Sequence, residues 1–309
     1  MTRRAFIGAD IFDGFTIHRD QALLLDCENF VGIGPVPDGY PATRVAGGTL
    51  APGFVDLQVN GGGGLMFNNA PAVATLERIA AAHAATGTRA LLPTLITDTA
   101  QKTHAAVDAV EQAIAASVPG IIGIHLEGPH LSVAKKGAHH ADLIRPMDDG
   151  DEAFLLGAAQ RLPNVMVTIA PETVTPQQIT RLAAAGIIVS LGHTDCTYAQ
   201  ARVAFAAGAR CVTHLFNAMS QMTAREPGLV GAALDVTGVS AGLIADNIHA
   251  HTSAMRVALT AKQEKDGIFL VTDAMATAGS EMTEFALNGR KVQRAGGRLM
   301  LEDGTLAGA

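Results

Sequence analysis

The sequence predicts an α/β fold, and three observations support this expectation. Eight apolar, strand-like segments follow one another between residues 54 and 272, and helical segments lie between most of them. Five of these strands have an acidic or histidine residue at or just after the same end. The chain has no Trp and only 4% aromatic residues, so small aliphatic side chains must build its core. Eight strand–helix units are typical of a (β/α)8 TIM-type barrel, and a doubly wound sheet is the alternative.

The two ends of the chain predict a small β-sandwich domain. Residues 1–51 contain short strand-like runs that Asp-Gly and Pro-Asp-Gly turn signals separate. Residues 279–309 contain similar runs, with Asn-Gly and Asp-Gly hairpin signals. We expect the second segment to return to the first and join its sheet. Because no helix follows the eighth strand, we also expect the natural protein to continue past Ala309.

The barrel is expected to occupy residues 52–278. Its strands are expected at 54–59, 90–94, 121–126, 165–170, 187–191, 212–215, 239–245 and 268–272. Ala-rich segments predict helices at 74–86, 99–117 and 198–207. Thr175 and Pro176 predict the N-cap and the first turn of another helix, which Gly186 ends.

Composition excludes several classes of protein. The formal net charge of −7 argues against nucleic-acid binding, which normally requires a basic surface. The three cysteines, Cys27, Cys196 and Cys211, are far apart, which favours a reducing compartment over a disulfide framework. The sequence shows no secretory signal and no run of 18 apolar residues. We therefore expect a cytoplasmic protein that binds neither nucleic acid nor membrane.

Three strand ends carry residues that bind divalent metals. These are Glu127, His193 and His214, and we expect them to converge because all strand ends of a parallel barrel open onto one face. One carboxylate and two imidazoles are a common ligand set for a catalytic ion that keeps a position open for water. A single such histidine is more often a hydrogen-bonded core residue, but three residues at equivalent strand ends favour a metal site.

Two further strand ends are expected to serve catalysis. Asp273 follows the eighth strand and is the candidate proton carrier, with a helix N-cap or a buried ion pair as the alternative. His249 follows the seventh strand and could polarise a carbonyl, although His251 competes for this role. His125 alternates with Glu127 along the third strand and is expected to orient a ligand.

Loops after the strands add candidate binding groups. The glycines at 61–64 would let the backbone approach a ligand closely. Arg225 follows the THLFNAMS segment that contains His214 and could hold a phosphate, with a surface ion pair to Glu226 as the alternative. His139, in the KKGAHH loop, is an intermediate case.

A set of motifs carries a specific resemblance. The segments are APGFVDLQVNGGGG, HLEGPHL with KKGAHH, SLGHTDCTY, THLFNAMS with REPGLVG, LIADNIHAH, and LVTDAMATAG. Together they cover nearly the whole chain, and the sequence resembles the N-acetylglucosamine-6-phosphate deacetylase family of the amidohydrolase superfamily.

The resemblance implies a barrel with a small β-sandwich and hydrolysis of the acetamide of N-acetyl-D-glucosamine 6-phosphate, in amino-sugar catabolism and recycling. It implies that Glu127, His193 and His214 bind the metal, that Asp273 is the general base and acid, and that His249 contacts the substrate and stabilises the transition state. It also implies sugar- or phosphate-binding roles for Ala138, Asn217, Ala218, Arg225, Asp246, Asn247, Ile248, His249, Leu306, Ala307 and Gly308. His125, His139, Gln58 and Asn60 are further substrate-contacting or ligand-supporting candidates.

The first strand departs from the wider superfamily, in which a His-x-His pair often binds a second metal. This sequence has Gln58-Val59-Asn60, and amides are poorer ligands for such ions than imidazoles. We therefore expect one divalent ion per subunit, zinc first, with iron(II), cobalt and manganese as alternatives. The family also implies a homodimer whose partner subunit supplies a basic group to the phosphate site.

Two other functions are alternatives. One is a different amidohydrolase reaction, such as opening a cyclic amide or deaminating a base. The other is a non-catalytic sugar-phosphate-binding protein that keeps the barrel and its metal for structure.

Overall fold

The computed structural model describes residues 3–264 and 266–309, and its contacts divide the chain into two compact units. The first unit ends at Phe54 and the second begins at Val55. The first unit holds two sheets, ordered β5-β4-β1-β6 and β3-β2-β7. Its strands are β1 (Arg3–Ile7), β2 (Asp10–Phe12), β3 (Ile17–His18), β4 (Ala22–Asp26), β5 (Asn29–Gly34), β6 (Ala42–Arg44) and β7 (Thr49–Leu50). The expected short strands of this segment are confirmed.

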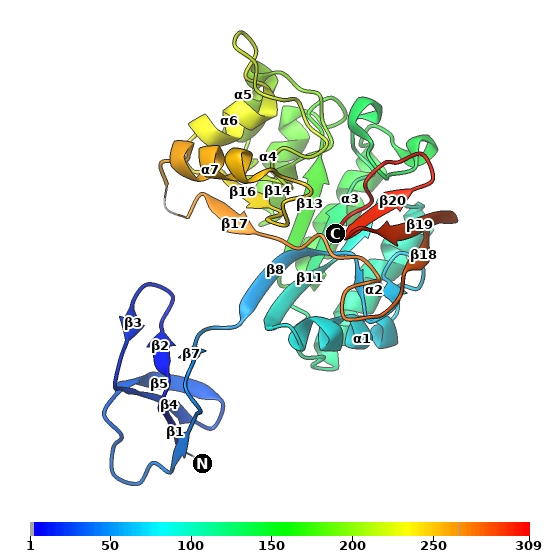
Figure 1. The fold of residues 1–309 in the computed structure, drawn as a ribbon. Helices are drawn as coiled ribbons and strands as arrows, with labels where there is room; N and C mark the ends of the chain where they lie inside the picture. The colour runs from blue at the N-terminus through cyan, green and yellow to red at the C-terminus, as the bar shows by residue number, and fades with distance from the viewer. Residues whose placement is uncertain (1–2, 265) are drawn as a thin grey trace. The chain divides into compact units, whose positions relative to one another are not determined.

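The second unit is built on an eight-stranded parallel sheet that nearly closes into a barrel (Figure 1). The sheet order β17-β16-β15-β14-β13-β12-β11-β8 is sequential, as a barrel requires. The parallel bridge between Val59 and Ala274 joins the two ends of this sheet. All eight expected strands are confirmed: β8 (Phe54–Val59), β11 (Thr88–Ile96), β12 (Ile124–Glu127), β13 (Val165–Ile169), β14 (Ile188–Leu191), β15 (Cys211–Val212), β16 (Ser240–Leu243) and β17 (Ile268–Leu270).

Helices follow the strands and lie along the outside of the sheet, each against a neighbouring helix (Figure 1). They are α1 (Val73–Ala84), α2 (Ala100–Ala115), α3 (Asp149–Arg161), α4 (Pro176–Ala184), α5 (Tyr198–Ala206), α6 (Gly228–Asp235) and α7 (Thr252–Ala261), with short 3-10 turns at Val133–Lys135 and Ala141–Leu143. The expected cap of α4 is confirmed, because the Thr175 hydroxyl accepts from the N–H of Gln178. None of the described helices is long and apolar enough to cross a bilayer.

Small aliphatic side chains fill the space between the sheet and the helices. Every residue of β13 is buried and all but Thr168 are apolar, since helices and the barrel interior cover the two faces of this strand. Val59, Ile124, Leu126, Val189 and Leu191 belong to this core and are at most 2% exposed. The core therefore holds the strand ends rigidly in place.

The C-terminal segment forms a sheet of its own. The strands β18 (Glu284–Leu287), β19 (Arg290–Ala295) and β20 (Arg298–Leu301) pair with one another, and a small hairpin of β9 (Gly61–Gly62) and β10 (Leu65–Met66) precedes α1. The apolar side chains of the three-stranded sheet pack with Met66, Ile96 and Met275. Among the described strands these three hydrogen-bond only with one another, and the expected return of this segment to the domain of residues 1–51 stays a prediction. The division into a barrel at 52–278 and one small domain from both ends stays a prediction.

Candidate active site

Four candidate residues lie at the C-terminal ends of barrel strands. Glu127 is the last residue of β12, while His193, His214 and Asp273 follow β14, β15 and β17. The backbone of the last three is left-handed, with φ of 47°, 30° and 53°. This conformation is unfavourable for residues other than Gly, and such strain is typical of functional sites. The strand ends thus turn sharply.

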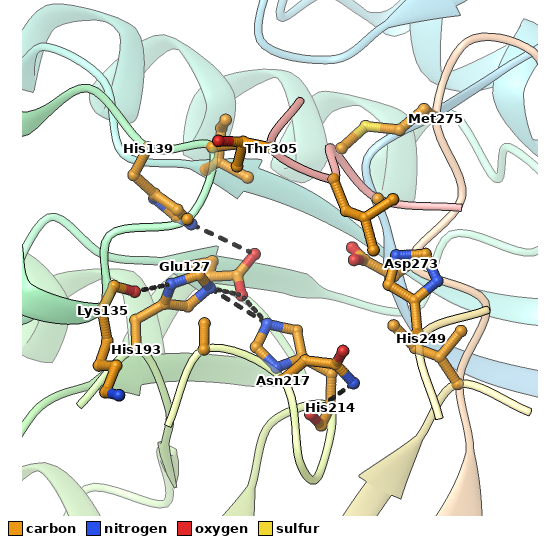
Figure 2. A pocket seen from close by; sticks show the side chains of 17 residues that line it. Glu127, Lys135, His139, His193, His214, Asn217, His249, Asp273, Met275 and Thr305 are labelled. Carbon is orange, nitrogen blue, oxygen red and sulfur yellow. Dashed lines mark hydrogen bonds and ion pairs between the residues drawn. The ribbon is translucent and has the colours of Figure 1, made fainter. Parts of the chain in front are cut away.

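These residues surround a cavity of about 400 Å³ (Figure 2). Eleven expected site residues line it: Glu127, Ala138, His139, His193, His214, Asn217, Ala218, His249, Asp273, Leu306 and Gly308. The cavity lies at the face of the barrel onto which all strand ends open, which is where enzymes of this architecture hold their active sites.

Three ligand atoms form a compact triangle in the cavity wall. The Oε1 atom of Glu127 lies 3.2 Å from Nε2 of His193 and 3.1 Å from Nε2 of His214, and the two nitrogens are 3.1 Å apart. Atoms bound to one zinc-type ion at about 2.1 Å lie roughly 3 Å apart, so the spacing fits. Nδ1 of His193 lies 2.8 Å from the carbonyl oxygen of Lys135, to which it donates, and this leaves Nε2 free to bind an ion. The triangle fits one divalent metal.

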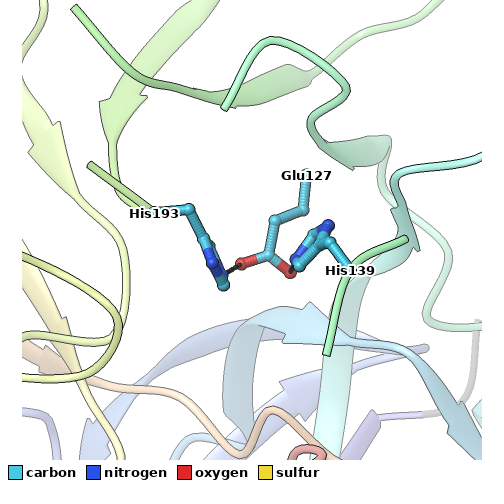
Figure 3. Close-up of side chains that lie close together, drawn as sticks. All are labelled: Glu127, His139 and His193. Atoms are coloured by element: carbon cyan, nitrogen blue, oxygen red, sulfur yellow. Dashed lines mark hydrogen bonds and ion pairs between the residues drawn. The ribbon is translucent and has the colours of Figure 1, made fainter. Parts of the chain in front are cut away.

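His139 lies on the other side of the Glu127 carboxylate (Figure 3). Glu127, His139 and His193 also form a cluster whose ligand atoms lie within 4.8 Å of one another. However, the N–H of Thr97 donates to Nδ1 of His139 at 3.3 Å, which assigns the ring proton to Nε2. That nitrogen lies 4.0 Å from Oε2 of Glu127. His139 is therefore better suited to donate a hydrogen bond than to bind a metal.

Charge stabilises the triangle. Burial raises the pKa of Glu127, but the adjacent rings of His193 and His214 outweigh it and hold that pKa well below its usual range. Burial lowers the pKa of His214, yet Glu127 outweighs it and raises that pKa overall. Burial also lowers the pKa of His139 well below its usual range, so this ring is neutral. A buried carboxylate facing two imidazoles is a cation-binding arrangement.

Asp273 is linked to the triangle through the first strand. Its Oδ1 accepts from Nδ2 of Asn60 at 2.6 Å and from Nε2 of Gln58 at 3.2 Å, and Gln58 also donates to Glu127 at 3.3 Å. Burial raises the pKa of Asp273 to about 7, and the charge of Glu127 adds to this effect. A carboxyl group with such a pKa is well suited to accept and return a proton near neutral pH.

The remaining candidates divide between the cavity and its surroundings. Arg225 is exposed and does not line the cavity. Asp246, Asn247 and Ile248 lie in the loop that carries His249, outside the cavity wall. Ala307 is fully buried in the core beneath the C-terminal sheet. These five residues do not line the cavity, and their expected contact with a sugar or phosphate stays a prediction.

His125 occupies the barrel interior. It is fully buried, and its ring bonds to the carbonyl oxygen of Leu57 at 3.1 Å and to the hydroxyl of Thr168 at 2.7 Å. Thr168 continues this chain of hydrogen bonds to Thr213 at 2.6 Å. None of its hydrogen bonds within the described residues reaches Glu127 or the two candidate histidine ligands, and the expected role of His125 in orienting a ligand stays a prediction.

Several cavity residues were not predicted: Ile96, Lys135, Gly137, Ile244, Met275 and Thr305. Lys135 lies in the KKGAHH motif, which could have indicated it. Arg290 and Asn288 were also missed, although Arg290 donates to the carbonyl oxygen of Ala138 and Asn288 donates to that of Thr97 at 3.2 Å. The β18–β19 hairpin therefore holds the segment of Ala138, which carries His139, and the segment of Thr97, which contacts it. No local sequence pattern reveals such contacts.

Comparison with known proteins agrees with this geometry. The profile of the amidohydrolase family matches residues 49–305. An N-acetylgalactosamine-6-phosphate deacetylase from Shewanella sp. (strain ANA-3) is 48% identical over 87% of this chain and 68% of the relative. An N-acetylglucosamine-6-phosphate deacetylase from Haemophilus influenzae is 35% identical over 99% of this chain and 80% of the relative. The crystal structure of N-acetylglucosamine-6-phosphate deacetylase from Pasteurella multocida is 36% identical, with a TM-score of 0.95 over 99% of this chain and 81% of that one.

Proposed function

Because the chain belongs to the amidohydrolase family, we propose that it is a metal-dependent deacetylase that hydrolyses N-acetyl-D-glucosamine 6-phosphate to D-glucosamine 6-phosphate and acetate, in amino-sugar catabolism and recycling. The observation that carries the proposal is the buried triangle of Glu127, His193 and His214, which Gln58 links to Asp273 in the wall of one cavity. This set supplies a metal site and a proton carrier, the two groups that amide hydrolysis requires.

We assign the metal to Glu127, His193 and His214, and we favour zinc, with iron(II), cobalt and manganese as alternatives. Two imidazole nitrogens and one carboxylate oxygen suit all four ions, and zinc is the commonest with such a set. The amide groups of Gln58 and Asn60 donate hydrogen bonds to Glu127 and Asp273, so they are engaged with carboxylates, and this supports a site for a single ion. The bound ion would supply Lewis acidity, lowering the pKa of water toward about 7 and polarising the acetamide carbonyl.

The protein's own residues carry the proton and stabilise charge. Asp273 takes a proton from the attacking water and later returns it to the departing amine, so that the amine leaves neutral. The rings of His139 and His249 line the cavity, where either can stabilise the oxygen that gains negative charge. Burial of these groups strengthens each interaction, because water does not compete with it.

N-acetyl-D-galactosamine 6-phosphate is the second candidate substrate. The relative from Shewanella, which is named for that epimer, is more similar in sequence than the relative from Haemophilus influenzae. The two sugars differ only at C4, far from the amide, and the same catalytic groups serve both. The ratio of kcat/KM for the two epimers identifies the better substrate.

We further propose a cytoplasmic homodimer. The three cysteines are free, which suits a reducing compartment. Arg225 is exposed outside the cavity of its own chain, and a second subunit that brings it to a neighbouring cavity would explain why this arginine follows the THLFNAMS motif. Light scattering on a sizing column measures the oligomeric state directly.

The test of the proposed function is acetate release with a defined metal. The protein is stripped, reloaded with zinc and assayed with both phosphorylated epimers and with unphosphorylated N-acetylglucosamine. We expect release only from the phosphorylated sugars. Release from cyclic amides instead would favour another amidohydrolase reaction, and tight sugar-phosphate binding without release would favour a binding protein.

A further inference from the structure

The loop between β16 and α7 holds an aspartate–histidine pair. Oδ2 of Asp246 lies 2.7 Å from Nδ1 of His249, and Oδ1 accepts from the backbone N–H groups of Ile248 and His249, both at 2.8 Å. Asn247 adopts a left-handed conformation with φ of 63°, which closes the turn. One carboxylate therefore fixes both the backbone of this loop and the histidine ring.

The pair presents one ring nitrogen to the cavity. The side chain of His249 is 6% exposed, whereas that of Asp246 is 27% exposed. Nε2 of His249 is buried, has no hydrogen-bond partner among the described residues, and belongs to a ring that lines the cavity (Figure 2). Since Nδ1 faces a carboxylate, Nδ1 must carry a proton. Nε2 then accepts a hydrogen bond through its lone pair when the ring is neutral, and donates one when the ring is an imidazolium.

An anionic substrate favours the imidazolium. The proposed substrate carries a phosphate and gains negative charge on its carbonyl oxygen during reaction. The hydrogen bonds of His249 and of the backbone outweigh burial and lower the pKa of Asp246, so Asp246 stays ionised.

We propose that Asp246 is a positioning residue, rather than a sugar contact, that accepts from Nδ1–H of His249 and so directs Nε2 into the cavity, where the imidazolium donates to the anionic part of the substrate. The proposal rests on the deacetylase function, because the charged ring would bind the negative charge of that substrate. It also explains why Asp246 lies outside the cavity wall although His249, three residues later, lines it.

Asp246→Asn separates positioning from loop structure. The Asn oxygen can still accept from the two backbone N–H groups, so the turn is kept. Its amide nitrogen then faces Nδ1 of His249 and donates to it, which forces the ring proton onto Nε2. The ring can still donate one neutral hydrogen bond, but it loses the stabilised charge. The analogous change in serine proteases leaves the geometry intact and lowers kcat about 10⁴-fold.

The experiment is a double-mutant cycle with Asp246→Asn, His249→Asn and both together, in the zinc-loaded protein. We expect Asp246→Asn to lower kcat/KM by about 10- to 1,000-fold, but by less than about twofold when His249 is already Asn. Equal losses in both backgrounds, or no loss from Asp246→Asn, would overturn the proposal. Asp142→Asn is the matched control, because Asp142 faces His140 at 3.9 Å with a side chain that is 90% exposed.

A second measurement does not depend on activity. Nitrogen-15 NMR distinguishes the two tautomers of a histidine ring, and His249→Asn identifies the signal. We expect Nδ1–H in the wild type and Nε2–H in Asp246→Asn. An unchanged tautomer refutes the positioning role. A tautomer switch in a protein that releases acetate from no substrate would leave the positioning role standing and refute the deacetylase function.

Discussion

Asp273→Asn should make the metal-free protein more stable while it removes activity. Burial raises the pKa of Asp273 to about 7, from 3.8 for an ordinary aspartate. This gap of about 3 pKa units corresponds to roughly 4 kcal/mol, at about 1.4 kcal/mol per unit. An Asn at this position never ionises, and its oxygen can still accept from Asn60 and Gln58. Ionisation of the buried carboxylate therefore lowers the free energy of unfolding of the wild type, and the variant does not suffer this loss.

The pH dependence is the signature of this effect. Below pH 3.8 both the folded and the unfolded protein hold the Asp273 proton, and the cost is absent. As the pH rises to about 7 the unfolded chain ionises while the folded protein holds its proton, so the wild type loses stability. Above about pH 7 the full cost is present. The advantage of the variant should therefore be about 2 kcal/mol at pH 5 and about 4 kcal/mol at pH 8.

The measurement is urea unfolding of chelator-treated protein at both pH values, beside an acetate-release assay of the zinc-loaded forms. Asp142→Asn is the control, since its exposed carboxylate should give a small difference at both pH values. We expect turnover of Asp273→Asn to fall by about 10²- to 10⁴-fold. The argument about burial would be refuted if Asp273→Asn were less stable than the wild type. It would also be refuted if the stability difference between the two proteins were the same at pH 5 and pH 8.

Three further predictions follow from the same cavity. A Cβ at Gly308 would lie 2.8 Å from the carbonyl oxygen of Asp273, whereas one at Gly304 meets nothing within 4 Å, although φ is positive at both (+69° and +82°). Gly308→Ala should therefore lower kcat/KM by about 10- to 100-fold and Gly304→Ala should change it little. Glu127→Gln should lower zinc content per chain by more than about tenfold in elemental analysis, because an amide is a poor ligand for this ion. Zinc binding near pH 7 should displace protons from His214 and Asp273, and calorimetry in two buffers should detect fewer of them in Asp273→Asn.

The sequence predicted the barrel and its ligand triangle for a single physical reason. Parallel strands that are buried on both faces must be apolar, so Glu127, His193, His214 and Asp273 stand out at their ends. The same reasoning did not reach Lys135, whose contribution to His193 is a backbone carbonyl that any residue possesses.

The C-terminal strands were predicted as hairpins, but not where they pack. Asn288-Gly289 is a local turn signal, and β18 and β19 do pair around it. Alternating apolar residues indicate that one face is buried, but they do not indicate which surface covers it. The contacts of Arg290 with Ala138 and of Asn288 with Thr97 span long stretches of chain and depend on the completed fold.

The route of the chain through the cavity sets an order in which the site can be assembled during synthesis. All three candidate ligands have left the ribosome once residue 214 has done so, whereas Asp273 and the hairpin that holds the His139 loop emerge later. A nascent chain can therefore capture its ion before it can move a proton. Metal binding would stabilise the six barrel strands already made, at the stage when their open sheet edges are most exposed to aggregation.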